Sequence, residues 1–331
     1  MHEQNIKAML KNISLLQTLE PIELDYILPF VKSYEFSANT LIIQQGKIGN
    51  GMYIIKQGSV QINIRLPGNI ENKIASLTEQ DFFGEIAFID GGVTTASVIT
   101  LNKTHCYFIS CDYFKMLQLC APIIAHKICT AIDQGVSKRL HHINQQLIGR
   151  LVDIKKMPYF AKRAKLSKPT LASLTELENR KINSNFLITL GVFKIFNAAE
   201  LSELFSHMKL RKAARGCIVF DEKDQASAFY IVAQGAVQTM VAKNNKLSKL
   251  SVIGPGGIFG LLAYFEKTIY SATALAREEI VILEFQYAEM KLLQHNNEIL
   301  FYKWHYVISQ TLVMMLRAAD KDLIRLASRL N

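Results

Sequence analysis

Residues 52–60 read MYIIKQGSV, and residues 229–237 repeat this stretch as FYIVAQGAV, with the tyrosine and the glycine in the same places. A second pair follows at nearly the same interval, because FFGEIAF at 82–88 aligns with IFGLLAY at 258–264. Solenoid repeats are several times shorter than this interval of about 176 residues. The sequence therefore predicts a duplicated domain.

The length and composition of the chain agree with two domains. It has 331 residues, half of them hydrophobic, which is long for one core and sufficient for two. We place the first domain at residues 1–152, a basic helical linker at 153–185 and the second domain at 186–331.

Most of the positive charge lies between the two repeats. The net charge is +10, and residues 119–190 hold twelve Lys and Arg against four Asp and Glu, concentrated in the run 155–168. Such a run can be a solvated linker or helix face. It can also bind an acidic partner, a nucleic acid or weakly an anionic membrane surface, and the sequence leaves these interpretations open.

The hydrophobic pattern of one repeat predicts an α+β fold. Apolar residues at helical spacing over 15–31 come first, and short apolar or alternating runs typical of strands follow. Gly58 is expected in the turn between two of these strands, where a positive φ is needed. The predicted strands are 41–43, 52–56, 60–64 and 96–101, followed by helices from 112 and from 122 to about 151.

The stretches FFGEIAF at 82–88, TTASV at 94–98 and YIIKQGSV at 53–60 resemble the cyclic nucleotide-binding domain family. This family includes catabolite activator-type regulators and the regulatory subunits of cyclic-AMP-dependent kinase. The resemblance covers nearly the whole chain as two copies, at about 15–151 and 190–330. It implies two tandem β-rolls (jelly-roll-like), each flanked by helices, with the ligand held on a short phosphate-binding cassette.

The first copy keeps part of the family's ligand-binding pattern. The resemblance implies a glycine, a glutamate that accepts the ribose 2′-hydroxyl, and an arginine that pairs with the phosphate. Gly84 and Glu85 match the first two, whereas Thr94 stands at the arginine position, so Arg65 is a candidate for an arginine from elsewhere. Glu85 can equally cap the cassette helix. The candidate ligand-binding residues are Gly84, Glu85, Ile86, Ala87, Thr94, Thr95, Ala96 and Ser97.

The second copy departs further from the pattern. Gly260 is kept, but Leu261 replaces the glutamate, and Tyr270 followed by Ser271 stands where the arginine belongs. Without both polar anchors, and with apolar bulk in their place, this cassette is predicted to be degenerate.

No enzymatic site is expected. The sequence has no Ser–His–Asp, Cys–His or HExxH arrangement and no Walker-type glycine loop, so we predict no catalytic residue, no metal and no cofactor. Five cysteines without a CxxC pair indicate reduced thiols in the cytoplasm. The N-terminal residues show no apolar signal region, and the stretch 299–316 is too polar for a transmembrane helix.

Two functions remain open. In one, the chain is a regulatory protein whose first domain senses a cyclic nucleotide and repositions the helix at 122–151. In the other, both domains are ligand-independent and form a scaffold whose helices bind another protein or a second copy of the chain. Nucleic acid is not the expected partner, because no helix-turn-helix follows the second repeat and the linker has little room for one.

Overall fold

The computed structural model describes residues 16–65, 71–153, 175–176, 184–243 and 246–327. The chain divides into two compact units. The first unit contains Met1–Ile143 together with Ser309–Asn331, and the second contains Asn144–Ile308. The boundaries at 152 and 186 stay a prediction, and the units differ from them in placing the end of the last helix with the first unit.

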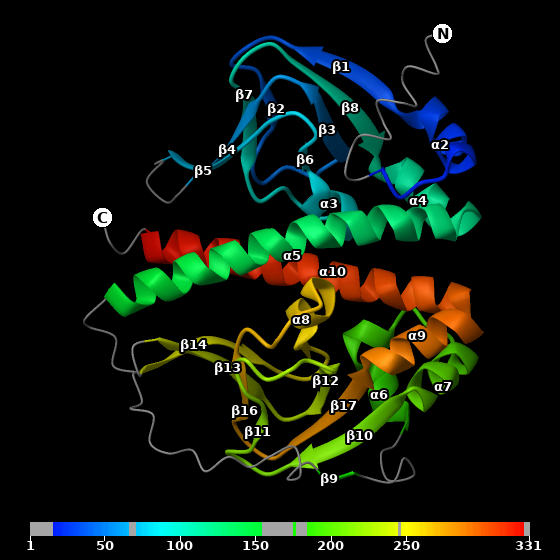
Figure 1. The fold of residues 1–331 in the computed structure, drawn as a ribbon, viewed down its shortest axis with the longest axis vertical. Coiled ribbons are helices and arrows are strands. Elements are labelled where there is room, and N and C mark those ends of the chain that lie inside the picture. The colour runs from blue at the N-terminus through cyan, green and yellow to red at the C-terminus, as the bar shows by residue number, and fades with distance from the viewer. Residues whose placement is uncertain (1–15, 66–70, 154–174, 177–183, 244–245, 328–331) are drawn as a thin grey trace. The chain divides into compact units, whose positions relative to one another are not determined.

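The first unit is a β-roll of two four-stranded antiparallel sheets (Figure 1). One sheet has the strand order β1-β8-β3-β6 and the other β2-β7-β4-β5. Its elements are α2 (Pro21–Ile27), the 3-10 helix η1 (Leu28–Phe30), β1 (Lys32–Phe36), β2 (Leu41–Ile43), β3 (Gly51–Gln57), β4 (Val60–Arg65), β5 (Glu71–Leu77), β6 (Phe82–Phe83), α3 (Glu85–Asp90), β7 (Ser97–Thr100), β8 (Thr104–Ser110), α4 (Cys111–Cys120) and α5 (Pro122–Asp153).

The turn between β3 and β4 depends on Gly58, as the sequence predicts. Its φ is +100°, and an added Cβ would lie 2.7 Å from the carbonyl oxygen of Lys103. The buried side chains of Val60, Ile62 and Ile64 on β4 then form a core with Phe83 and residues of β7 and β8. Alternate residues of this strand therefore point into the interior of the β-roll.

The second unit repeats this topology. Its sheets have the orders β15-β12-β17-β10-β9 and β11-β16-β13-β14, which match the first unit strand for strand apart from the additional β9. Its elements are β9 (Thr175–Glu176), α6 (Ser184–Thr189), the 3-10 helix η3 (Gly191–Phe193), α7 (Ala198–Ser206), β10 (Met208–Ala213), β11 (Ile218–Phe220), β12 (Ala228–Gln234), β13 (Val237–Lys243), β14 (Lys246–Ile253), β15 (Ile258–Phe259), α8 (Leu261–Glu266), β16 (Thr273–Ala276), β17 (Ile280–Gln286), α9 (Tyr287–Asn296) and α10 (Glu298–Ala327).

The α+β class with two tandem β-rolls is therefore confirmed. Most of the linker predicted at 153–185 lies outside the described residues, including its basic run at 155–168. Within it, Thr175 and Glu176 form β9 and pair with β10, so the helical interpretation is wrong at these two positions. Strand pairing with β10 determines their conformation there.

The last helix contributes to the first unit. From Ser309 onward α10 packs against α5, where the Ser309 hydroxyl donates a hydrogen bond to Oδ2 of Asp133 at 2.7 Å. Ile324, further along α10, packs against the core of the first β-roll. A segment that follows the second β-roll in sequence thus covers part of the first.

Candidate functional site

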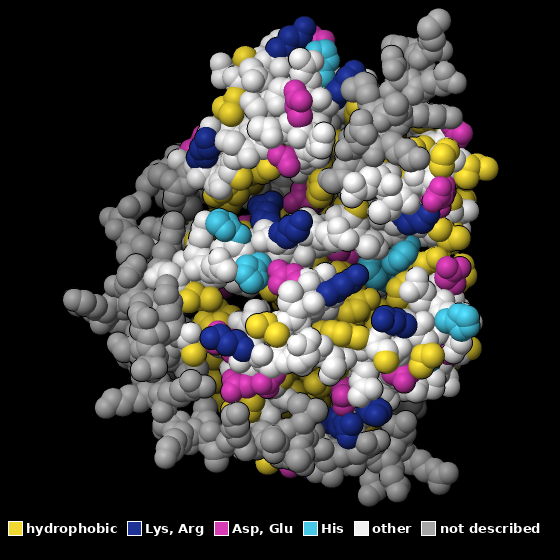
Figure 2. Space-filling model, viewed as in Figure 1, with side chains coloured by type: hydrophobic (Ala, Val, Ile, Leu, Met, Phe, Trp, Pro, Cys, Tyr) yellow, Lys and Arg dark blue, Asp and Glu magenta, His cyan; other side chains and the backbone are white. Residues whose placement is uncertain are grey.

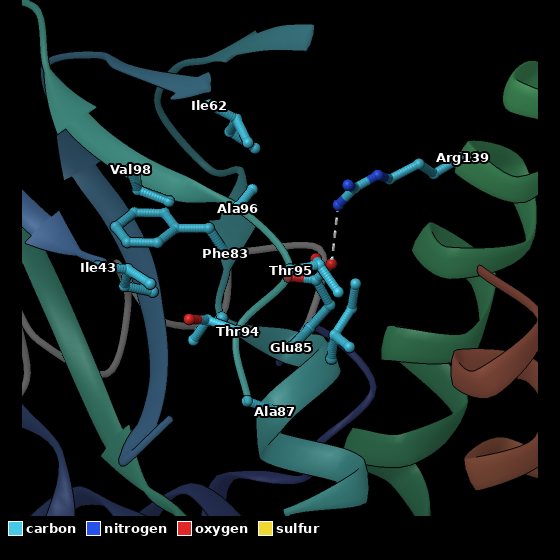
Figure 3. A pocket seen from close by; sticks show the side chains of 12 residues that line it. Ile43, Ile62, Phe83, Glu85, Ala87, Thr94, Thr95, Ala96, Val98 and Arg139 are labelled. Atoms are coloured by element: carbon cyan, nitrogen blue, oxygen red, sulfur yellow. Dashed lines mark hydrogen bonds and ion pairs between the residues drawn. The ribbon is translucent and has the colours of Figure 1, made fainter. Parts of the chain in front are cut away.

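The cassette of the first β-roll begins where β6 ends. Gly84 has a φ of +85° and forms the N-cap of α3, and a Cβ on it would lie 2.8 Å from the carbonyl oxygen of Gly51. A left-handed residue at this position turns the chain sharply from the strand into the helix. Glu85, the first residue of α3, points its carboxylate toward Arg139 of α5 (Figure 3).

Glu85 is buried and paired with an arginine from α5. Nη1 of Arg139 lies 3.2 Å from Oε1 of Glu85, and Nη2 of the same guanidinium lies 3.3 Å from Oδ2 of Asp320 on α10. The exposed fractions of the two carboxylate side chains are only 8% and 2%. One guanidinium therefore joins the cassette, α5 and α10 through two largely desolvated ion pairs (Figure 3 shows the first).

Burial and the Arg139 charge act in opposite directions on the pKa of Asp320. Desolvation raises the pKa of Asp320 above its usual range, and the nearby Arg139 charge counteracts that rise. Removing the arginine would leave two buried carboxylates close together without a counter-charge.

A pocket adjoins Glu85, with an empty volume of about 360 Å³ that includes its open mouth. Seven of the eight predicted cassette residues line it, while Ser97 accepts a hydrogen bond from the backbone N–H of Gln45 at 3.0 Å. Sequence reasoning missed the other lining residues. The lining comprises Ile43, Ile62, Phe83, Gly84, Glu85, Ile86, Ala87, Thr94, Thr95, Ala96, Val98 and Arg139.

Thr94 does not replace the family's arginine chemically. Its hydroxyl donates to the carbonyl oxygen of Gln44 at 2.6 Å and lies 3.1 Å from that of Lys47. Its backbone N–H also donates to Lys47, at 2.8 Å. The side chain thus fixes the loop before β3 and points away from Glu85 (Figure 3).

The positive charge at the pocket comes from Arg139 and not from Arg65. The Arg65 side chain is 59% exposed and lies 3.6 Å from Glu71. Arg139 follows the buried Val136 by three residues and precedes the buried Leu140 on α5. A cation within the apolar stripe of a helix was the signal that could have identified it.

The cassette of the second β-roll is filled by its own side chains. Tyr270 stacks on Phe220 with ring centroids 3.7 Å apart, and its hydroxyl donates to the carbonyl oxygen of Ala228 at 2.6 Å. Both rings lie against Gly260, since a Cβ there would be 3.2 Å from Tyr270 and 3.3 Å from Phe220. Leu261 is fully buried and Ser271 is exposed. Aromatic packing occupies the region that is open in the first unit.

A second link holds α10 against the first cassette. Nε of Arg317 lies 2.5 Å from Oδ2 of Asp90, and Nη2 lies 2.8 Å from Oδ1, while Nη1 donates to the carbonyl oxygen of Val93. Asp90 ends α3, and Val93 immediately precedes Thr94. Both ends of the cassette helix are therefore attached to α10, through Arg139 at Glu85 and through Arg317 at Asp90.

Within the described ranges, no group of three or more His, Cys, Asp and Glu could hold a metal ion. Over those ranges, too, no helix is long and apolar enough to cross a membrane. The five cysteines are free thiols.

The sequence profile of the cyclic nucleotide-binding domain matches residues 34–119 and 210–297, which together are more than half of the chain. The chain belongs to the cyclic nucleotide-binding domain family. Both matches fall on the β-rolls, one in each unit, and include the two cassettes.

Members of this family in eukaryotic kinases are among the similar proteins. The chain is 20% identical over 280 residues to the cAMP-dependent protein kinase regulatory subunit of Mycosarcoma maydis, covering 82% of this chain and 44% of that protein. It is 30% identical over 125 residues to the cGMP-dependent protein kinase of Plasmodium berghei, covering 37% and 14%. The chain thus spans less than half the length of either relative.

Among solved structures, the regulatory domain of Toxoplasma gondii PKA with cAMP is similar at 15% identity and a TM-score of 0.33. That alignment covers 90% of this chain and 94% of the other.

Proposed function

We propose that this chain is a non-enzymatic regulatory protein in which the first β-roll binds a ligand of the nucleotide class through its ribose. The observation that carries the proposal is the position of Glu85, whose side chain is 8% exposed and lines a pocket with an empty volume of about 360 Å³, open mouth included. A carboxylate placed in this way accepts hydrogen bonds from ribose hydroxyls. The membership of both β-rolls in the cyclic nucleotide-binding domain family supports the same ligand class.

The contacts of Glu85 suggest how occupancy would be transmitted. Ribose hydroxyls that donate to Glu85 compete with Arg139, and Arg139 also contacts Asp320 on α10. A ligand shifts an equilibrium only by its differential affinity for two states. Here the two states differ in whether Arg139 and α10 remain attached to the cassette, so α5 and α10 are the elements that respond.

The second β-roll has a structural role in this proposal. The stacked pair Tyr270–Phe220 lies against Gly260, where a ligand would approach the cassette glycine. Opening this site would require breaking the hydrogen bond from Tyr270 to Ala228 and exposing both rings.

The readout is a protein partner or a second copy of the chain, bound through helices. Exposed apolar side chains gather at the end of the first unit where α2 and α4 lie (Figure 2). They include Ile22 and Leu119, whose exposed fractions are 78% and 85%. The free cysteines are consistent with the cytoplasm, where thiols stay reduced.

Isothermal titration calorimetry with adenine and guanine nucleosides and cyclic nucleotides tests the proposal. Glu85→Gln keeps the size of the side chain and removes its charge, and a lost charge-assisted hydrogen bond of about 1.5–3 kcal/mol weakens binding about ten- to a hundredfold. Glu71→Gln on β5, where the side chain is 52% exposed, is the matched control and should bind as the parent does.

If none of these compounds binds the parent chain at millimolar concentration, the proposal is wrong. The ligand-independent scaffold is then the better description. Neither cassette would in that case bind a nucleotide-class ligand.

A further inference from the structure

We infer that the pocket of the first β-roll selects a neutral ribose-bearing ligand, a nucleoside, over a phosphorylated one, and that Asp320 is a residue that sets this selectivity. The inference rests on the proposed function and narrows the ligand class of the same site.

The selectivity follows from the charged side chains that line the pocket. Among the described residues of the lining, Arg139 is the only Lys or Arg. Its guanidinium lies between two carboxylates, 3.2 Å from Glu85 and 3.3 Å from Asp320. Because both carboxylates are almost fully buried, solvent screens neither of them. An anionic ligand that enters the pocket therefore meets a cation whose charge is already neutralised by two carboxylates.

The cassette itself supplies no replacement charge. Thr94, at the family's arginine position, uses its hydroxyl on the backbone of Gln44 and Lys47. The neighbouring Thr95 is half-buried and carries only a neutral hydroxyl. A neutral donor gives a hydrogen bond about half as strong as a charged one. A phosphate held here would lose much of its hydration without gaining a counter-charge.

The same lining suits an uncharged nucleoside. Glu85 is an acceptor for ribose hydroxyls, and the apolar side chains of Ile62, Phe83 and Val98 face the pocket (Figure 3). Ligand pockets commonly combine an apolar wall with a few placed polar groups in this way. Removing the phosphate from a nucleotide keeps every one of these contacts and removes the unfavourable desolvation.

Asp320 has a particular role because it comes from α10 and not from the cassette. Its carboxylate pairs with Nη2 of the same guanidinium whose Nη1 pairs with Glu85, and its side chain is 2% exposed. Replacing it with Asn keeps the shape and an oxygen acceptor but leaves one positive charge of Arg139 shared with Glu85 alone. That change makes the pocket one charge more positive and favours an anionic ligand.

The experiment compares adenosine with 3′,5′-cyclic AMP, and guanosine with 3′,5′-cyclic GMP, by isothermal titration calorimetry on the full chain. The parent should bind a nucleoside about tenfold or more tightly than its cyclic nucleotide. In Asp320→Asn, cyclic nucleotide affinity should rise about fivefold or more, with a salt dependence that the nucleoside lacks. Asp322→Asn, whose carboxylate is 50% exposed on the same helix, should behave as the parent.

Thermal unfolding of each variant confirms that it is folded. Arg139→Lys is a second test of the ligand preference, because lysine keeps the positive charge but lacks the forked guanidinium that reaches both carboxylates. Cyclic nucleotides that bind the parent as tightly as nucleosides would overturn the inference and leave the proposed function intact. An unchanged ligand preference in a folded Asp320→Asn protein would overturn the role of Asp320. Failure of the parent to bind any of these ligands would overturn the proposed function as well.

Discussion

A buried carboxylate between α5 and α10 makes the stability of the first unit depend on pH. Asp133 is fully buried and receives a hydrogen bond from the Ser309 hydroxyl at 2.7 Å. Burial raises its pKa from 3.8 to about 8, and the hydrogen bond only partly opposes this rise. The folded state therefore holds a proton that the unfolded state releases above about pH 4.

The sign and size of the effect follow from this proton. The folded state binds more protons than the unfolded state between about pH 4 and pH 8, so the free energy of unfolding falls as the pH rises through that window. One proton contributes about 1.4 kcal/mol per pH unit. Between pH 5.5 and 7.5 we expect Asp133 to lower the stability by about 3 kcal/mol.

Chemical denaturation of the parent and of Asp133→Asn at pH 5.5, 6.5 and 7.5, followed by circular dichroism, measures this effect. Asparagine mimics the protonated carboxyl, so its stability advantage over the parent should grow by about 1.4 kcal/mol per pH unit. Asp112→Asn, at a side chain that is 95% exposed, is the control and should show no such trend. A constant difference in stability between Asp133→Asn and the parent across the three pH values would contradict a raised pKa of Asp133 in the folded state.

Substitutions at three further positions, with matched controls, test the contacts of the two cassettes by thermal unfolding. Arg317→Ala breaks the bidentate pair with Asp90 and should cost about 2–4 kcal/mol, whereas Arg325→Ala, at a 72% exposed side chain, should cost less than about 0.5 kcal/mol. Tyr270→Phe removes one buried hydrogen bond and should cost about 1–2 kcal/mol, and Tyr270→Ala about 3–5 kcal/mol, so equal costs would contradict the packing. Gly84→Ala should destabilise by more than about 2 kcal/mol, because its Cβ meets the backbone of Gly51; Gly91→Ala has a similar φ and open space, and should cost only about 1 kcal/mol.

The sequence was sufficient to predict the duplicated β-roll because the repeat carries its local signals twice. Gly58 and Gly235 both have a positive φ, and the strands at 41–43, 52–56 and 60–64 have the expected alternation or apolar runs. The sequence pattern does not predict the strands β1, β5 and β8. Their residues mix charged and polar side chains with apolar ones, and their strand conformation depends on partners such as the β1–β8 ladder.

The site could be predicted only where its residues are close in sequence. Gly84, Glu85 and Thr94 belong to one cassette, and a pattern can align them. Arg139 lies 54 residues from Glu85, and Asp320 lies 181 residues from Arg139. Long-range contacts of this kind depend on the packing of α5 and α10, which no local spacing encodes.

The position of α10 also sets an order for biosynthesis. A chain emerging from the ribosome completes the strands of the first β-roll long before residues 309–327 exist, yet those residues supply Asp320, Arg317 and the core contact of Ile324. Domains generally fold as units as they emerge. Here the first unit must wait, with Arg139 lacking one of its two carboxylates, until the entire second β-roll has been translated.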